Sequence, residues 1–372
     1  MIHFNNAGAS LMPQPVYDAV TGHLALEQRL GGYEAEERAG DAICAMYDAL
    51  ARLLRVAAGE IAYVENATRA WDMAFYALPL QPGDRIITHA SEYASNYLAF
   101  LQQAGRRGLE IDVAPSDATG QIDVAALPGL IRARTRLIAI THVPSQGGLV
   151  NPAAEVGRIA REHGLIYQLD ACQSVGQLDV DVSAIGCHIL SGTGRKFLRG
   201  PRATGFLYVS NAVLDRLDPP FIDLRAATWV TEDSYELAPG AKRFETWESY
   251  VAGRVGLARA VEYALDIGLK RIERRVAELA EHLREALSYV GAEVHDQGET
   301  QCGIVTFGMK ERSADDIALA LKAAGCNVSV ARAVSAQLDL GRRGLPPLVR
   351  ASLHYYNTEA EIARFCDVLV RG

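Results

Sequence analysis

The sequence predicts an α/β fold in which a mostly parallel, mixed sheet lies between helices, followed by a smaller α+β domain. Two observations support this prediction. Between residues 16 and 210, short apolar runs alternate with segments such as AAEVGRIAREHG, which has the 3.6-residue apolar period of a helix. The apolar runs are also nearly continuous, which is typical of parallel strands that are buried on both faces.

Six strands are expected in this first part of the chain. They begin near residues 60, 84, 109, 137, 165 and 188 and read EIAYVENAT, DRIITHA, LEIDVAPS, LIAITHV, LIYQLDA and HILSGT. Helical segments separate them, as the connections between parallel strands require. In such a sheet the loops at the carboxyl ends of the strands form the ligand-binding crevice.

Residues 251–290 predict either two helices or one helix with a break near Gly268. Beyond them, EVHDQ, CGIVTFGM, CNVSVA and LVRASLHYY read as strands, and capping boxes at Ser313 and Thr358 predict the starts of two helices. We therefore expect a large cofactor-binding domain over residues 16–250. Residues 251–372, together with the N-terminal segment 1–15, are expected to form a small domain.

The composition excludes several classes of function. The 372 residues carry a net charge of -8, which argues against binding to nucleic acid or to a membrane surface. No apolar run reaches the roughly 18 residues of a membrane-spanning helix, and the start, MIHFNNAGASLMP, does not resemble a signal peptide. We therefore expect a cytoplasmic protein. The six cysteines show no zinc-binding spacing, so we expect no metal site and mostly buried, reduced thiols.

The strongest functional signal is HILSGTGRKFLRGPRATGFLYV, residues 188–209, in which Lys196 lies on a small-residue loop between two apolar strands. The preceding apolar strand, LIYQLDACQ, ends in Asp170. This pairing is what pyridoxal 5′-phosphate (PLP) chemistry requires, because the lysine forms a Schiff base and the acid keeps the pyridine nitrogen protonated. The alternatives are a surface lysine with an acidic partner, and an aspartate that only caps a helix.

The phosphate of such a cofactor would lie where a strand meets the N-terminus of a helix. Asn66-Ala67-Thr68 fits this description, and the amides of Ala67 and Thr68 with the Thr68 hydroxyl would bind the phosphate. Ser191 would add a hydroxyl and Arg195 a positive charge. The alternative for the Asn-Ala-Thr sequence alone is an ordinary helix cap.

Three further residues are candidates for the site. Tyr93, at another strand end, is the first choice to stack on the cofactor ring, with Trp71 second; either could instead be a core aromatic residue. Gln173 could reach the cofactor's phenolic oxygen. Arg350 stands in an apolar strand, where a lone arginine is costly, and could bind a substrate carboxylate unless it forms a structural ion pair.

Taken together, these segments resemble the class V aminotransferase group of fold-type I PLP enzymes, in the broad sense that includes cysteine desulfurases. The resemblance covers most of the chain. In order along the sequence, it rests on FNNAGAS, SEYASN, THVPSQGGLVNP, LDACQSVGQ, SGTGRKFLRGP, RFETWES and RASLHYYNTEAEI. It implies a fold-type I PLP-transferase fold and a homodimer with active sites at the subunit interface, to which part of the 243–249 segment would contribute.

The same resemblance implies roles for individual residues. Lys196 would be the Schiff-base lysine, Asp170 the partner of the pyridine nitrogen, and Gln173 a neighbour of the phenolic oxygen. The phosphate would lie on Thr68, Ser191 and Arg195. The carboxylate of an amino-acid substrate would lie on Arg350.

The chain also departs from the desulfurase pattern. Desulfurases carry a catalytic cysteine shortly before the arginine strand, whereas this chain has none between Cys326 and Arg350. Tyr93-Ala94 replaces the usual stacking histidine, and Gly194-Arg195 stands where the lysine loop of the family has its histidine. In these respects the chain looks more like the branch that contains the ergothioneine-pathway C–S lyase.

We therefore expect a PLP-dependent C–S lyase that converts an S-substituted cysteine into a thiol, pyruvate and ammonia. An aminotransferase or epimerase would use the same residues, and a decarboxylation-coupled deamination is a third possibility, because the cofactor carries the chemistry and the pocket selects the bond. A binding module that has lost its activity is disfavoured, since the chain keeps both the lysine and the acid.

Overall fold

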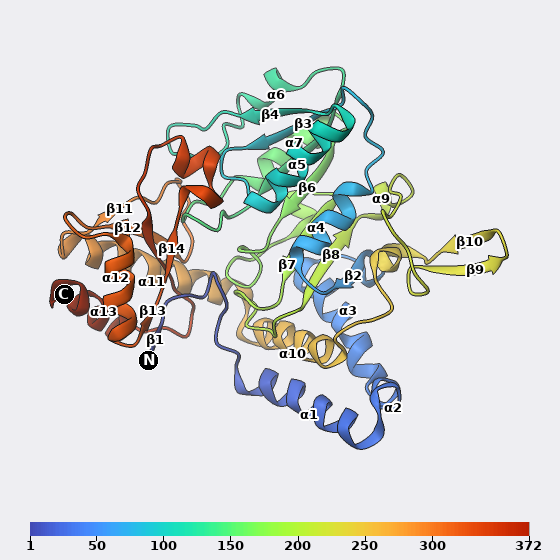
Figure 1. Cartoon of the computed structure of the whole chain (residues 1–372), viewed down its shortest axis with the longest axis horizontal. Coiled ribbons are helices and arrows are strands. Elements are labelled where there is room, and N and C mark those ends of the chain that lie inside the picture. The colour runs from blue at the N-terminus through green and yellow to red at the C-terminus, as the bar shows by residue number, and fades with distance from the viewer. Residues whose placement is uncertain (372) are drawn as a thin grey trace.

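A seven-stranded mixed sheet organises the first part of the chain in the computed structural model, which describes residues 1–371 (Figure 1). The strands lie side by side in the order β2-β8-β7-β6-β5-β3-β4. Their bounds are β2 Ile61–Val64, β3 Arg85–His89, β4 Glu110–Ala114, β5 Thr135–Thr141, β6 Ile166–Asp170, β7 Ile189–Thr193 and β8 Gly205–Val209. From β7 to β4 all neighbours are parallel, and β8 runs antiparallel to both β7 and β2. The predicted mixed α/β class and all six predicted strands are confirmed.

Helices cover both faces of this sheet. Neighbouring residues of β2 show the alternation. Ile61 and Tyr63 pack in a core with α3, α7 and α10 (Val251–Ile267), whereas Ala62 and Val64 pack on the other face with α4 and α5. The helices of this part are α1 Gln14–Leu30, α2 Gly32–Arg38, α3 Gly40–Leu54, α4 Ala67–Tyr76, α5 Ala94–Arg107, α6 Leu127–Leu130, α7 Ala153–Glu162, α8 Val182–Ile185 and α9 Asn211–Leu214, with short turns η1 Ala58–Glu60 and η2 Gly240–Phe244.

The second part of the chain is built on an antiparallel sheet of four strands in the order β11-β12-β15-β14. Its strands are β11 Glu293–Val294, β12 Ile304–Gly308, β14 Ser329–Ala331 and β15 Leu348–Ser352. The helices that pack on it are α11 Leu269–Tyr289, α12 Ala314–Ala323 and α13 Glu359–Arg371. Between β14 and β15 lie two short turns, η3 Ala333–Ser335 and η4 Gln337–Gly341.

The predicted helix starts in this part are confirmed by their capping contacts. The Ser313 hydroxyl accepts from the backbone N–H of Asp316 at 3.1 Å. At Thr358 the box is reciprocal, because Thr358 Oγ1 accepts from the Glu361 N–H and Glu361 Oε2 accepts from the Thr358 N–H. The predicted break at Gly268 is also present: this residue has φ +93° and separates α10 Val251–Ile267 from α11.

The N-terminal segment joins the second part of the chain. β1 (Ile2–His3) pairs in parallel with β13 (Cys326–Asn327), and both termini lie on the same side of the molecule in Figure 1. Helix α10, in contrast, packs against α1 and α3 of the first part. The division into domains at residue 250 stays a prediction.

A hairpin that the sequence analysis did not anticipate extends away from the body of the molecule in Figure 1. Its strands are β9 Ala227–Thr231 and β10 Ser234–Leu237. It carries exposed aromatic side chains, among them Trp229, which is 71% exposed. Every residue from Thr228 to Thr231 and from Ser234 to Glu236 is exposed. No helix formed by residues 1–371 is long and apolar enough to cross a membrane.

Candidate active site

Lys196 and Asp170 line the same pocket at the carboxyl ends of the parallel strands. Asp170 is the last residue of β6, and Lys196 follows β7 on the loop to β8. About 430 Å³ of space lies between the residues that line the pocket, and this value includes part of its open mouth. Its lining consists of Asn66, Ala67, Thr68, Tyr93, Thr141, Val143, Ser145, Asp170, Cys172, Gln173, Thr193, Arg195 and Lys196.

Asp170 is held by two donors that leave its carboxylate facing the pocket. Asn96 Nδ2 donates to Oδ2, and the backbone N–H of Cys172 donates to Oδ1, both at 2.9 Å. The side chain is 3% exposed. No helix begins directly after β6, so the alternative role of a helix cap does not apply.

Lys196 is likewise buried, with 7% of its surface exposed, so it is not the surface lysine of the alternative interpretation. No carboxylate lies within 4 Å of its amine among residues 1–371. Burial lowers the pKa of this amine; Asp170 opposes the shift and the Arg195 guanidinium adds to it. The structure thus provides a desolvated amine, the state that a nucleophilic lysine requires.

The N-terminus of α4 forms another wall of the pocket. Asn66 is its N-cap, and its Oδ1 accepts from the Arg69 N–H at 2.9 Å. The amides of Ala67 and Thr68 have no helical partner, as at every helix start, and both residues line the pocket. Gly205, the first residue of β8, lies so close that a Cβ there would be 2.6 Å from the Asn66 carbonyl carbon.

Thr193, rather than Ser191, lines the pocket from β7. Ser191 lies one step deeper on the same face of the strand, where its Oγ is fully buried and has no hydrogen-bond partner. The Thr193 hydroxyl donates to the Thr204 carbonyl oxygen at 3.2 Å and retains its lone pairs. Arg195 also lines the pocket, and its guanidinium donates to the Gly8 carbonyl oxygen.

The structure separates the two aromatic candidates for ring stacking. Tyr93 is half-buried and lines the pocket as the N-cap of α5. Trp71 is buried in the apolar core against Phe75 and Phe100, so the structure does not bring it to the pocket. Tyr93 is therefore the aromatic residue at this site.

Gln173 and Arg350 meet at Ser145, a residue that sequence reasoning missed. Gln173 Nε2 donates to Ser145 Oγ at 3.0 Å, and Arg350 Nη1 donates to the Ser145 carbonyl oxygen at 2.6 Å. Arg350 Nη2 also donates to Asn5 Oδ1 at 3.3 Å. No carboxylate pairs with Arg350 among the described residues, so the alternative of a structural ion pair is not observed. Burial, with Arg195 nearby, lowers the pKa of Arg350 to about 10.

Other pocket residues also escaped sequence reasoning. Thr141 and Val143 line the pocket because they lie at or just after the end of β5. Their position at the end of a strand was the only sequence signal that could have identified them. The same signal holds for the residues that the sequence analysis did choose as candidates, so it could not separate the two groups.

The pocket fits PLP in charge and in hydrogen bonding. A carboxylate stands on one wall, and two cations and a helix N-terminus stand on others. Two buried polar atoms at or beside the pocket, Gln173 Oε1 and Arg350 Nε, lack a partner in the protein. Buried polar groups are normally paired, so these atoms indicate a polar ligand.

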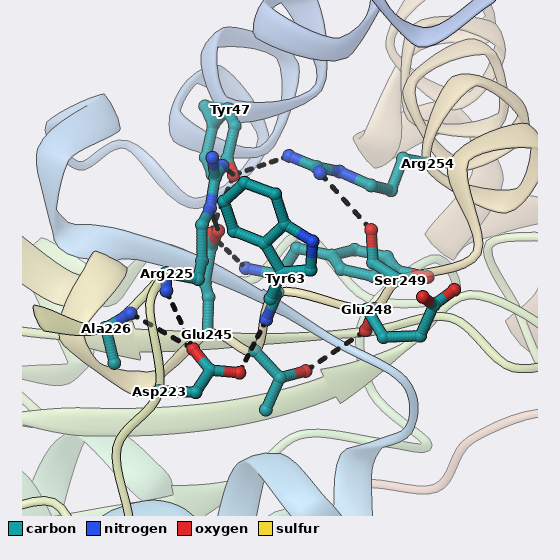
Figure 2. A network of polar contacts seen from close by, with 11 residues as sticks. Tyr47, Tyr63, Asp223, Arg225, Ala226, Glu245, Glu248, Ser249 and Arg254 are labelled. Carbon is teal, nitrogen blue, oxygen red and sulfur yellow. Dashed lines mark hydrogen bonds and ion pairs between the residues drawn. The ribbon is translucent and has the colours of Figure 1, made fainter. Parts of the chain in front are cut away.

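A separate polar network fixes the 243–249 segment and the base of the β9–β10 hairpin (Figure 2). Glu245, which is buried, accepts hydrogen bonds from the Tyr47 hydroxyl at 2.7 Å and from Arg225 Nε at 2.9 Å. Asp223 accepts from the Trp247 N–H at 2.7 Å. Arg225 is thus engaged in this network, and Trp247 remains exposed on a firmly held segment.

Comparisons with known proteins agree with this geometry. The sequence matches the aminotransferase class-V family over residues 2–365. A probable cysteine desulfurase of Methanothermobacter thermautotrophicus is 30% identical over 99% of this chain and 94% of its own length. The apo cysteine desulfurase of Thermococcus onnurineus NA1 superposes with a TM-score of 0.92 at 28% identity, covering 100% of this chain and 94% of that one.

A further structural neighbour is the cystine C–S lyase C-DES, solved with its reaction product cysteine persulfide. It has a TM-score of 0.89 and covers 99% of this chain and 97% of its own, but at 24% identity the likeness shows the fold alone. The predicted resemblance to the family is confirmed. The chain belongs to the class-V aminotransferase family and is a PLP-dependent enzyme that acts on an amino acid.

Proposed function

We propose that the protein is a C–S lyase that cleaves an S-substituted cysteine into a thiol, pyruvate and ammonia, because it resembles the branch of the family that contains the ergothioneine-pathway C–S lyase. The observation that carries this proposal is the lack of a cysteine at the position of the desulfurase nucleophile. The segment between Cys326 and Arg350 contains β14, η3 and η4 but no thiol. A sulfur atom released from the substrate must therefore leave with its own substituent.

Two other cysteines, Cys326 and Cys172, are poorly suited to replace that nucleophile. Cys326 is buried in the β13 pairing with β1. Cys172 lines the pocket, but burial, with the Asp170 carboxylate adding to it, raises the pKa of its thiol well above the usual value. The reactive form of cysteine is the thiolate, so Cys172 is held in its unreactive state.

PLP, when bound, would withdraw electrons from the Cα atom of the amino acid. We assign Lys196 to the covalent attachment of the cofactor and Asp170 to its pyridine nitrogen. Tyr93 would stack on the ring, and Gln173 would lie at the phenolic oxygen. The places of these residues on the pocket wall support the assignments.

The phosphate would lie at the N-terminus of α4, on the amides of Ala67 and Thr68 and on the Thr68 hydroxyl. Arg195 would add its charge. We propose Thr193 as the hydroxyl from β7 in place of Ser191, because Thr193 lines the pocket and Ser191 does not.

Proton transfer would be the task of Lys196. Its Nζ would take the proton from the substrate's Cα and return a proton to the departing sulfur, so that the C–S bond breaks and a neutral thiol leaves. Water then converts the remaining three-carbon unit into pyruvate and ammonia. The lowered pKa of Lys196 supports this role, since a base must be deprotonated. Arg350 would hold the substrate carboxylate, with its guanidinium oriented by Ser145 and Asn5.

The enzyme would work as a homodimer. The exposed aromatic surface of the β9–β10 hairpin and the exposed Trp247 on the anchored 243–249 segment support this proposal. Sedimentation of the purified protein tests it: a monomer at micromolar concentration would contradict shared active sites.

The decisive experiment is a single turnover with stoichiometric S-substituted cysteine and no keto-acid acceptor. Release of thiol, pyruvate and ammonia with the cofactor unchanged would support the lyase. Conversion of the cofactor to its amine form, with the keto acid of the intact substrate, would identify an aminotransferase. Appearance of the D-enantiomer would identify an epimerase, and release of carbon dioxide a decarboxylating deaminase.

A further inference from the structure

Glu92 is a second carboxyl group behind the pocket, and the proposed chemistry gives it no role. It precedes Tyr93 in the turn between β3 and α5 and is only 7% exposed. Its Oε2 accepts from Thr88 Oγ1 at 2.9 Å. Its Oε1 accepts from three donors: the Tyr93 N–H and Asn96 Nδ2, both at 2.9 Å, and the Thr141 hydroxyl. Such a complete set of donors suits an ionised carboxylate.

Asn96 connects this group to Asp170. Its Nδ2 lies 2.9 Å from Glu92 Oε1 and 2.9 Å from Asp170 Oδ2, so one amide group serves both carboxylates. The amide nitrogen carries two N–H groups, one for each acceptor. If the amide turned over, its oxygen would face both acceptors and repel them. Glu92 therefore fixes the orientation in which Asn96 donates to Asp170.

We propose that Glu92 and Asn96 are positioning residues, which hold the Asp170 carboxylate toward the cofactor and strengthen its hold on a protonated pyridine nitrogen. This inference rests on the proposed role of Asp170. Asn96 fixes the orientation of the Asp170 carboxylate, because it donates to Oδ2 while the Cys172 N–H donates to Oδ1. Glu92 supplies the orientation of Asn96 and a second negative charge.

The charge matters because the two carboxylates repel each other. Burial raises the pKa of Glu92 to about 7, and the negative charge of Asp170 contributes to the shift. The interaction between two charged groups is reciprocal. The negative charge of an ionised Glu92 therefore also favours the binding of a proton or another cation close to it. A protonated pyridine nitrogen at Asp170 is such a cation. The Arg195 guanidinium, which also lines the pocket, acts against the binding of that cation.

The test compares four variants loaded with PLP labelled with ¹⁵N in the ring. Glu92→Gln removes the charge but keeps an acceptor of the same shape, and Asn96→Ala removes the bridge. Asp170→Ala removes the acid itself. Asn151→Ala is the matched control, because Asn151 is equally buried and hydrogen-bonded near Ser91 but contacts neither carboxylate.

Two quantities are measured: the ¹⁵N chemical shift of the ring nitrogen, which reports its protonation, and the dissociation constant of PLP from quenching of tryptophan fluorescence. We expect Glu92→Gln and Asn96→Ala to shift the nitrogen signal part of the way toward the unprotonated position and to weaken PLP binding about tenfold, the equivalent of one pKa unit. Asn151→Ala should leave the nitrogen signal unchanged.

Three other results would each contradict a different part of this reasoning. If Asp170→Ala moves the nitrogen signal while Glu92→Gln and Asn96→Ala leave it in place, the positioning role is wrong and the role of Asp170 stands. If Asn151→Ala moves the signal as far as Asn96→Ala, the effect is general loosening and the inference is wrong. If Asp170→Ala leaves the signal unchanged, the proposed role of Asp170 is wrong as well.

Discussion

Gly205 offers a direct test of how the sheet positions the phosphate-binding wall. A Cβ atom at this position would lie 2.6 Å from the Asn66 carbonyl carbon and 2.9 Å from the Ala67 nitrogen. Ordinary contacts begin at 3.4 Å, so an alanine at position 205 requires a displacement of about 0.8 Å. β8 is hydrogen-bonded to β2 on one side and to β7 on the other, so the start of α4 must move.

The expected loss of PLP affinity depends on which groups are displaced at the start of α4. The amides of Ala67 and Thr68 are those assigned to the phosphate, and a hydrogen bond to a charged group contributes about 1.5–3 kcal/mol. Loss of one such bond would weaken PLP binding roughly 10- to 100-fold, and the crowding itself would cost about 1–3 kcal/mol of stability. Gly205→Ala should therefore bind PLP far more weakly than the native protein.

The assay is titration of the apo protein with PLP, followed by fluorescence quenching, alongside urea unfolding. Gly105→Ala in α5 is the matched control, because a Cβ there meets nothing within 4 Å. It should leave PLP binding unchanged and raise stability slightly, since alanine is the better helix former. If Gly205→Ala binds PLP within twofold of the native affinity, β8 does not set the position of this wall.

Four further outcomes are expected. Lys196→Ala should lose the borohydride-reducible cofactor adduct; an adduct that persisted would refute the assignment of the lysine. Asp170→Ala should retain PLP poorly and lose most turnover, and near-normal rates would exclude its role at the ring nitrogen. Arg350→Lys should raise KM for the amino acid about tenfold or more with PLP affinity unchanged, because the bidentate contact is lost. The pKa of Glu92 is raised from 4.5 to about 7, so the native state binds the extra proton and stability falls as pH rises between these values. In urea unfolding, Glu92→Gln should therefore gain stability relative to the native protein by up to about 3 kcal/mol from pH 4 to pH 8, and parallel pH profiles would contradict it.

The sequence predicted the sheet and the central pair of the site because both depend on local signals. Apolar runs with helical patterns between them define parallel strands, and Lys196 and Asp170 stand where two such strands end. Thr68 was predicted for the same reason, at the start of α4.

Residues that depend on depth within a strand could not be chosen from the sequence. Ser191 and Thr193 lie two residues apart on the same face of β7. The alternation of side chains between the two faces of a strand therefore cannot distinguish them. Thr193 reaches the pocket because it is the last residue of β7, and the sequence indicates the end of a strand only to within a few residues. Trp71 was undecided for a related reason: the apolar face of α4 predicted burial but not its partners.

Contacts between distant segments were also beyond local reasoning. Asn96 meets Asp170 across 74 residues, and no spacing in the sequence indicates this. The β9–β10 hairpin was missed because its strands have no buried face and thus no alternation of apolar and polar residues.

The pairing of β1 with β13 has a consequence for the order in which the molecule can be built. The segment that starts with β1 also contacts the pocket, where Gln173 Nε2 donates to the Ala7 carbonyl oxygen at 3.1 Å. The partners of this segment, Cys326 and Ser352, are synthesised more than 300 residues later. At about 5–20 residues per second, Ala7 waits roughly 15–70 s on the ribosome before Ser352 exists. The sheet can form during translation, but the N-terminal segment that contacts Gln173 gains its last partners only when synthesis is nearly finished.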